Sequence, residues 1–457
     1  MSNKNLWQKY WDVNSVAQTA HRGENPLSLI VKGLQSMLVM FGATIIVPLT
    51  LGMSPQVTLF GMGVGTLIFL MITKGKSPLT MGSSFAFMIG VLGIIDAAGG
   101  PFAGDAFTHD QRLQYALGGI ITAGVVYLLF SVLVKIIGAK RFMRYMPHGV
   151  TGPTVVLIGV TLAPHAINQF STNWILGPLT AIIIIVVMMF GKGKVKAFPI
   201  LIGLGIAYFV AVMMNLAGAT NADGSAIVSF AAVAEADLIG LPPFMTPRFH
   251  IVPILMMAPF ALATVAENIA DHVIVGAEMG EDLLLDKPGL SRTLFADGIQ
   301  SMLVAAFGTP MNTTYSENVG LLIITKVFSS VVVAIGAVFA ILLGLSPAVA
   351  EIIRSIPVSI IGGASIMLYG MIASIGMRNV KEHVDLNIVK YLIIMSVMLV
   401  VGIGMRFGTP IVVNIAGESV RLDRMNLPVA IILGMILNAV LPNQVDDDGK
   451  KDTTSAK

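Results

Sequence analysis

The chain has 457 residues, of which 55% are hydrophobic and only 12% charged, and its mean hydropathy is +0.84. A soluble domain carries about 25% charged residues on its water-facing surface, so this composition excludes an ordinary soluble protein and indicates one that crosses a membrane several times. The net charge of +3 does not favour a nucleic-acid partner, and the absence of cysteine excludes disulfides and thiolate metal sites.

The predicted elements are about fourteen apolar segments, judged against a membrane span of roughly 20 residues. The segments after Ser84 and after Glu317 are too short for a complete span, and the second of these nearly merges with the segment that follows it. The sequence therefore predicts an all-α polytopic membrane protein with short broken segments at spans 3 and 10. The fourteen segments begin near Leu29, Gln56, Ser84, Leu113, His148, Asn173, Phe198, Ile251, Ser291, Glu317, Val327, Ile356, Asn387 and Leu427.

Basic residues in short loops favour an orientation with both termini in the cytoplasm, because cytoplasmic loops carry an excess of lysine and arginine. The polar segment 1–28 has no apolar stretch typical of a secretory signal, and the polar tail 443–457 is predicted to be disordered. Arg406, Arg421 and Arg424 lie near the last outer loop, against the trend. The loops placed inside contain Lys74, Lys76, Lys135, Lys140, Arg141, Arg144, Lys192, Lys194 and Lys196.

Two short motifs occupy corresponding positions in the two halves of the chain. Segment 3 opens with Gly82-Ser83-Ser84-Phe85 and segment 10 with Asn312-Thr313-Thr314-Tyr315. Paired interrupted segments of this kind point to the binding site of a transporter. Seven spans in each half, an odd number, would make the second half inverted relative to the first. The alternative is that these serines and threonines only help helices to pack closely.

Carboxyl groups within apolar segments are the main candidates for chemistry, because each costs about 2.5–3.5 kcal/mol at the centre of a span. Glu267 and Asp271 are four residues apart, so they share one helix face, where like charges repel. Glu317 opens the tenth segment. The alternatives are that Glu267 contacts water near a helix end and that Glu317 only caps a helix N-terminus. Asp96, Asp297 and Glu351 lie near segment ends, where we expect solvated side chains.

Phe85 offers a ring face against which a flat heteroaromatic ligand could stack, with carboxylates accepting N–H groups at its edge. The alternative is that Phe85 only packs against other side chains. The scattered histidines contain no pair at the spacing of a helical H-E-x-x-H zinc site. We therefore expect no metal, no cofactor and no catalytic site, so the chain is not predicted to be an enzyme.

Several motifs together resemble one family. The run from Ser316-Glu317-Asn318-Val319-Gly320 to Thr325-Lys326 is similar to the signature of the nucleobase–ascorbate transporters, also called nucleobase:cation symporters 2. The resemblance covers nearly the whole chain and is greatest to the bacterial uracil permeases. Further matching motifs are FGATIIVP (41–48), MGSSFAF (81–87), TVAENIADH (264–272), GTPMNTTYSENVG (308–320) and MLYG (367–370).

The resemblance implies two inverted seven-span repeats, with short extended strands in spans 3 and 10 that cross near the centre of the membrane. It also implies a core domain that moves against a gate domain. The core would comprise residues 29–145 (spans 1–4) and 251–345 (spans 8–11), and the gate residues 146–218 (spans 5–7) and 346–442 (spans 12–14), with an extracytoplasmic loop at 219–250.

The resemblance also implies the residues of the site. Glu267 and Glu317 would each accept an N–H of a nucleobase, Phe85 would stack on the base, and backbone near Ala86 and Ser316 would complete the contacts. The implied substrate-binding residues are Phe85, Ala86, Glu267, Asp271, Ser316 and Glu317. The implied supporting or proton-coupling residues are Ser84, Asp271, Tyr315, Asn318 and Tyr369.

Two residues point to different substrate branches of this family. Asp271 stands where the uracil transporters have histidine, and His272, one place later, lies on another helix face. An aspartate there is similar to the xanthine and urate branch, whereas Glu317 resembles the uracil branch. We expect a proton symporter that imports uracil or a related pyrimidine by alternating access across a bacterial inner membrane, as a homodimer. The alternatives are a xanthine or purine symporter, sodium coupling and, more remotely, an anion exchanger or channel.

Overall fold

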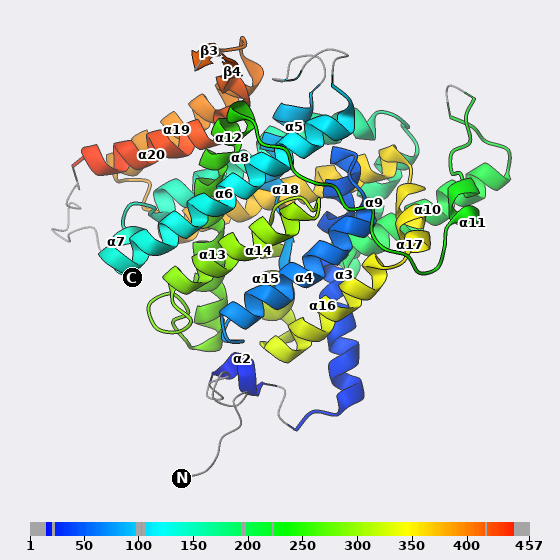
Figure 1. The fold of residues 1–457 in the computed structure, drawn as a ribbon, viewed down its shortest axis with the longest axis horizontal. Helices are drawn as coiled ribbons and strands as arrows, with labels where there is room; N and C mark the ends of the chain where they lie inside the picture. The colour runs from blue at the N-terminus through cyan, green and yellow to red at the C-terminus, as the bar shows by residue number, and fades with distance from the viewer. Residues whose placement is uncertain are drawn as a thin grey trace.

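The computed structural model describes residues 15–442, apart from 21–22, 97–101, 103–106, 193–194, 196–197, 222–223 and 416–417. For Glu317, Ile324, Ile415 and residues 418–420 only the backbone is described. The predicted segments 1–28 and 443–457 therefore lie largely or wholly outside the described residues. The chain folds as a bundle of helices with two small sheets, one of them buried and one at the edge (Figure 1).

Helices account for every predicted segment, and each helix begins within four residues of the start predicted for it. In the first half they are α3 (Pro26–Leu51), α4 (Pro55–Ile72), α5 (Phe85–Ile95), α6 (His109–Ile137), α8 (His148–Phe170), α9 (Leu176–Phe190) and α10 (Pro199–Leu216). In the second half they are α12 (Ile251–Met257) with α13 (Ala261–Met279), α14 (Leu290–Ala306), α15 (Ser316–Thr325), α16 (Ser330–Gly344), α18 (Val358–His383), α19 (Val389–Phe407) and α20 (Asn426–Val440).

Shorter elements connect these helices. They are α2 (Val16–Thr19), α7 (Ala139–Met143), α11 (Ala231–Glu235), α17 (Pro347–Arg354) and two 3₁₀ turns, η2 (Ala258–Phe260) and η3 (Leu422–Met425). The turn η2 joins α12 to α13 within the eighth predicted span, and such a 3₁₀ stretch inside a helix commonly marks a hinge or strain. The outer sheet pairs β3 (Val412–Ile415) with β4 (Glu418–Arg421).

Within the described residues, nine helices or joined helices are long and apolar enough to cross a membrane. The bent pair of α16 and α17, with 84° between its parts, makes a tenth candidate. Helices suit this setting because they satisfy their own backbone hydrogen bonds where no water is available. The chain is thus a multi-pass membrane protein, and the count of fourteen spans stays a prediction for the shorter helices.

The two broken segments meet directly. Strand β1 (Met81–Ser83) pairs antiparallel with β2 (Asn312–Thr314), with Gly82 opposite Thr313, and every residue of both strands is buried. The Ser84 amide extends the pairing by donating to the Met311 carbonyl at 2.9 Å. Each strand leads into a short helix, β1 into α5 and β2 into α15. The expected extended crossing of spans 3 and 10 is confirmed.

Helix packing repeats between the two halves. Helix α4, the second predicted segment, packs on α16, the eleventh. Helix α14, the ninth predicted segment, packs on α6, the fourth. A shift of seven segments converts one contact into the other, as two repeats of seven require. The assignment of these helices to a core and a gate domain stays a prediction.

Candidate functional site

The start of α15 lies against the acidic face of α13. Ser316 Oγ is 2.7 Å from Asp271 Oδ1 and 3.3 Å from Glu267 Oε1, so its single proton can be donated to either carboxyl group. Asp271 is 2% exposed, whereas Glu267 is half-buried. The predicted common face of Glu267 and Asp271 is therefore real, and it is directed at the first residue of the tenth segment.

The two half-helices α5 and α15 begin at opposite ends of the strand pair, because β1 and β2 run antiparallel and each leads into its helix at its carboxyl end. A helix leaves its first four N–H groups without intrahelical partners. The start of α15 therefore presents donors beside the carboxyl groups of α13, and the start of α5 presents donors at the other end of the strand pair. The Ser84 side chain caps α5 by accepting from the Phe87 amide at 3.5 Å. Ala86 is buried in the first turn of α5.

Phe85 and Tyr369 form an aromatic wall at the start of α5. The Phe85 ring is 7% exposed and contacts Tyr369 of α18 edge to face, with centroids 5.6 Å apart and planes at 75°. Tyr369 is buried. Tyr315, also buried, packs its ring against the backbone of Gly82, where an added Cβ would come within 2.5 Å of the ring. An aromatic residue thus lies at the end of each strand.

Glu317 and Asn318 follow Ser316 in the first turn of α15. Asn318 is fully buried, and its amide donates to Thr80 Oγ1, so it ties α15 to the segment before β1. Glu317 is the second residue of α15 by its backbone, and its side chain lies outside what the structure describes. Its predicted role as an N–H acceptor stays a prediction.

The expectation that the Asp297 side chain is solvated was wrong. It is fully buried on α14, and its Oδ2 accepts a hydrogen bond from Asn268 Nδ2 at 2.6 Å. Thr293 Oγ1 donates to Asn268 Oδ1 at 3.3 Å. Position near a segment end misled the prediction, because α14 is packed between other helices. The sequence does contain a signal for an inward polar stripe, because polar residues recur three and four positions apart along α14. These residues are Thr293, Asp297, Gln300 and Ser301.

The same stripe supports the strands. Gln300 Nε2 and Ser301 Oγ donate to the Asn312 carbonyl at 2.7 and 2.6 Å, and Thr66 Oγ1 accepts from the Met81 amide at 3.1 Å. A two-stranded sheet has two open edges, and its unpaired backbone groups need partners inside a membrane protein. Side chains of α4 and α14 supply them, and single-residue reasoning had missed this role.

His272 occupies a different face from Asp271, as the helix geometry predicted. Its Nδ1 is 2.8 Å from the Asn268 carbonyl and its Nε2 is 3.0 Å from Ser77 Oγ. A carbonyl only accepts, so Nδ1 carries the proton and Nε2 accepts from the serine hydroxyl. His272 therefore joins α13 to the segment after α4 and makes no described contact with Ser316.

Asp96 and Glu351, expected to be solvated, take part in ion pairs. Asp96 at the end of α5 pairs with Arg424 of η3, and Glu351 pairs with Arg354 at 3.1 Å. Arg421 pairs with Asp423 at 2.6 Å. Arg421 and Arg424, which ran against the charge trend, are thus neutralised within the fold.

Metal ligation finds no support in the described part of the chain, where no three acidic or histidine side chains gather closely enough to hold an ion. What the arrangement offers is a half-buried carboxylate, a buried carboxyl group, helix N–H donors and an aromatic wall. These groups suit a flat, polar, uncharged ligand that carries both donors and acceptors.

Comparisons with known proteins show the family of the chain. Residues 27–411 match the model of the Permease family. The uracil permease of Bacillus subtilis (strain 168) is 34% identical over 442 residues, which cover 92% of this chain and 94% of the relative. The uracil permease of Bacillus caldolyticus is 34% identical over 431 residues, which cover 91% and 92%.

A solved structure shares the architecture. The transmembrane domain of a cyanobacterium bicarbonate transporter, BicA, aligns with a TM-score of 0.62 at 14% identity, covering 90% of this chain and 96% of that one. At that identity the likeness shows the fold alone. The family match and the relatives over most of the chain go further, and they confirm the resemblance that the motifs indicated. The chain belongs to the Permease family, alongside the bacterial uracil permeases.

Proposed function

We propose that this protein imports uracil by proton symport with alternating access. The observation that carries the proposal is the cluster in which Ser316 joins Glu267 and Asp271 at the N-terminus of the half-helix α15. Phe85 stands at the start of the other half-helix, α5. The names of the relatives, uracil permeases, supply the substrate.

The cluster matches the edge chemistry of uracil. Uracil carries two ring N–H donors and two carbonyl acceptors. Glu267 accepts one N–H, and the side chain of Glu317, placed one residue after Ser316, is the proposed second acceptor. Unpaired backbone N–H groups at the starts of α5 and α15, near Ala86 and Ser316, donate to the carbonyl oxygens. Phe85 stacks on the ring, and Ser84, Tyr315, Asn318 and Tyr369 hold these groups in place.

Proton coupling follows from the cost of a buried charge. Asp271 is 2% exposed and lies next to a second carboxyl group, and an unpaired charge inside a membrane is expensive. Proton binding to this cluster from outside neutralises the site, substrate binding then permits the core to move, and release of both inside resets it. The proton is the proposed ion, and sodium is the rival.

Uptake into proteoliposomes tests the proposal. Radiolabelled uracil should accumulate when the outside is acidic at a clamped membrane potential, and accumulation should disappear when the pH gradient is removed. A response to a sodium gradient alone contradicts proton coupling. Excess unlabelled xanthine should compete poorly, and xanthine competition equal to that of uracil would establish the purine alternative instead.

The first variant prediction is that Glu267→Gln weakens uracil binding about tenfold or more. The reason is that a charge-assisted hydrogen bond is worth about 1.5–3 kcal/mol, and an amide accepts less strongly. Glu235→Gln, on the surface helix α11, is the matched control. Isothermal titration with uracil measures the change, and equal affinities of the two variants contradict the assignment.

An anion exchanger is the less favoured function. The likeness to a bicarbonate transporter concerns the fold alone, and the acidic face of α13 repels an anion where the proposed ligand binds. Bicarbonate should therefore neither compete with uracil nor be exchanged. The bacterial plasma membrane, cytoplasmic termini and a homodimer remain part of the proposal, on the strength of the loop charges and the family resemblance.

A further inference from the structure

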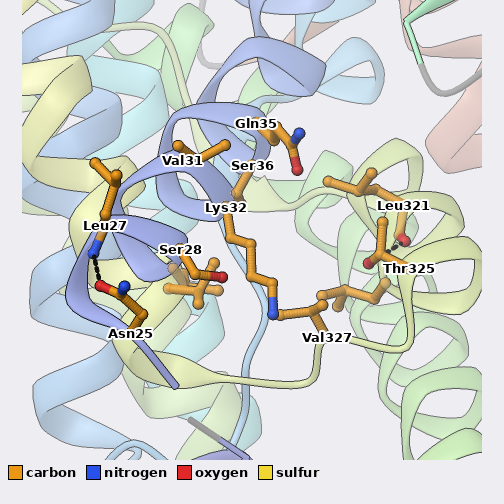
Figure 2. Close-up of a pocket in the computed structure, with 13 residues that line it drawn as sticks. Asn25, Leu27, Ser28, Val31, Lys32, Gln35, Ser36, Leu321, Thr325 and Val327 are labelled. Carbon is orange, nitrogen blue, oxygen red and sulfur yellow. Dashed lines mark hydrogen bonds between the residues drawn. The ribbon is translucent and has the colours of Figure 1, made fainter. Parts of the chain in front are cut away.

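A cavity of about 630 Å³ lies away from the proposed uracil site, between the start of α3, the end of α15 and the start of α16 (Figure 2). A close contact between α3 and α16 lies beside the cavity. A Cβ added to Gly336 of α16 would come within 2.9 Å of the Gly33 carbonyl of α3, so the two backbones touch there. The cavity follows the start of α3 from Asn25 to Ser36, at the end of the helix where the loop charges predict the cytoplasmic surface.

The walls of the cavity are mainly apolar and open outward. Leu321 and Leu322 of α15 and Val332 of α16 line it as buried side chains. At its edge Val31 is 43% and Leu27 66% exposed. Exposed apolar residues on a helix that is long and apolar enough to span a membrane face lipid chains rather than water. The volume lies within the range typical of small-molecule sites, roughly 300–1,000 Å³.

Lys32, which lines the cavity, forms an ion pair with Glu24. Lys32 Nζ lies 2.5 and 2.6 Å from the two carboxylate oxygens of Glu24, and the two side chains are 29% and 27% exposed. Lys32 is six residues into α3, about 9 Å along its axis, and it extends its stem across the cavity toward Val327 (Figure 2). This is a lysine that directs its ammonium group to the polar boundary of the membrane.

Deeper in the cavity Ser36 has an unused donor. It is 3% exposed, it lines the cavity, and its hydroxyl has no hydrogen-bond partner among the described residues. A buried hydroxyl without a partner is costly, so an acceptor on a ligand would lower its energy. Ser36 is one helical turn, about 6 Å, farther in than Lys32. A ligand that contacts both Lys32 and Ser36 therefore has a charged end, a hydrogen-bond acceptor about one helical turn deeper, and an apolar part beyond the acceptor.

We propose that this cavity binds one zwitterionic glycerophospholipid from the adjacent leaflet. Lys32 contacts its phosphate, Glu24 its ammonium group, Ser36 an ester carbonyl, and the apolar walls one acyl chain. The paired acid and base select a zwitterion, because Lys32 and Glu24 together carry no net charge and so offer an anionic headgroup no net attraction. Leu321 and Leu322 lie on the same half-helix as Ser316, so the lipid braces the element that carries the proposed uracil contacts.

Lipid binding to the delipidated full-length protein tests this proposal. Dioleoylphosphatidylethanolamine is titrated and the bound fraction is read by native mass spectrometry. Lys32→Ala should weaken binding about tenfold, because a hydrogen bond to a charged group is lost. Lys135→Ala, which removes an exposed lysine from the last turn of α6, should change nothing. Ser36→Ala should weaken binding less than Lys32→Ala.

Three results would overturn the proposal. One is equal lipid binding by Lys32→Ala and Lys135→Ala. Another is a preference for phosphatidylglycerol over phosphatidylethanolamine, which would assign an anionic headgroup. The third is that inorganic phosphate raises the melting temperature of the delipidated protein as much as the lipid does, which would assign a free anion. Should Lys32→Ala not fold, judged by size-exclusion profile, unchanged lipid binding by Ser36→Ala rejects the proposal, because the binding readout does not depend on transport.

Discussion

The Ser316 hydroxyl connects two regions that lie 45 residues apart in the sequence, the acidic face of α13 and the start of α15. Helical spacing predicts that Glu267 and Asp271 share a face, because residues four apart lie one above the other. It does not predict what that face contacts. The family resemblance implies that backbone near Ser316 contacts the base, and this stays a prediction. The structure adds that the Ser316 side chain contacts Glu267 and Asp271.

The pair of Asp297 and Asn268 likewise shows that local sequence does not predict which groups a side chain contacts. Asp297 was expected to meet solvent, yet it is fully buried and accepts from Asn268. Burial depends on which helix packs on α14, and that information is not local to the sequence around Asp297. An inward carboxyl group without its donor would be costly.

The second prediction is that Asn268→Ala lowers the melting temperature of the purified protein. The expected loss is about 1.5–3 kcal/mol, because the buried Asp297 carboxyl group loses a hydrogen bond. Asn387→Ala, at an exposed position, is the control and should stay within about 0.5 kcal/mol. Adding Asp297→Leu to Asn268→Ala should recover part of the loss, because both polar partners are then gone. An unaltered melting temperature for Asn268→Ala contradicts this view of the pair.

The strand pair β1–β2 is the element on which the site is built. Three backbone-paired positions on each strand fix where α5 and α15 begin, and with them where Phe85 and Ser316 lie. The sequence indicated two interrupted segments in corresponding places, from their short apolar runs and small hydroxyl residues. It did not give the register, because strands this short leave no alternating pattern to read.

The third prediction is that Gly82→Ala abolishes uracil uptake. A Cβ at this position would come within 2.5 Å of the Tyr315 ring, closer than contacts between such atoms allow, so the strands must separate or the ring must move. Gly205→Ala in α10, where an added Cβ meets nothing within 4 Å, is the control and should transport normally. Uptake by the two variants is compared at equal amounts of protein in the membrane. Normal uptake by Gly82→Ala would show that the crossing tolerates displacement.

At the scale of the whole molecule, an ion pair joins η3 to the end of α5. Arg424 of η3, 7% exposed, pairs with Asp96 and also donates to the Gly93 carbonyl of α5 at 3.3 Å. Asp96 falls in the predicted core and Arg424 in the predicted gate. A contact across that boundary on the side predicted to be external must break if the two domains separate there, so it favours the state in which that side is closed.

The fourth prediction concerns this ion pair. Asp96→Arg and Arg424→Asp each place like charges together and should reduce uracil uptake, whereas the double variant restores an opposite pair and should recover much of it. Coupling between close charges across an interface starts at about 1.5 kcal/mol, roughly tenfold in rate or affinity. We expect the low end, because the Asp96 side chain is 36% exposed and so partly screened. A double variant no better than either single variant contradicts the coupling.

Local sequence was sufficient to predict the class of protein, the helices and their breaks. Apolar content forces the chain into a membrane, the lengths of apolar runs place the helix starts, and a local motif is enough to signal each broken segment. The family followed from motifs spread over the chain. All of these are properties of residues near one another in the sequence.

The partner of each polar group depends on how the helices pack in three dimensions. The pairing of β1 with β2, the contact of Ser316 with α13, the burial of Asp297 and the pairing of Arg424 with Asp96 all join residues at least 29 apart. In a membrane a polar group must find its partner inside the protein, and many polar residues along the chain could serve. Packing of the two halves selects among them, and that selection depends on the whole fold at once.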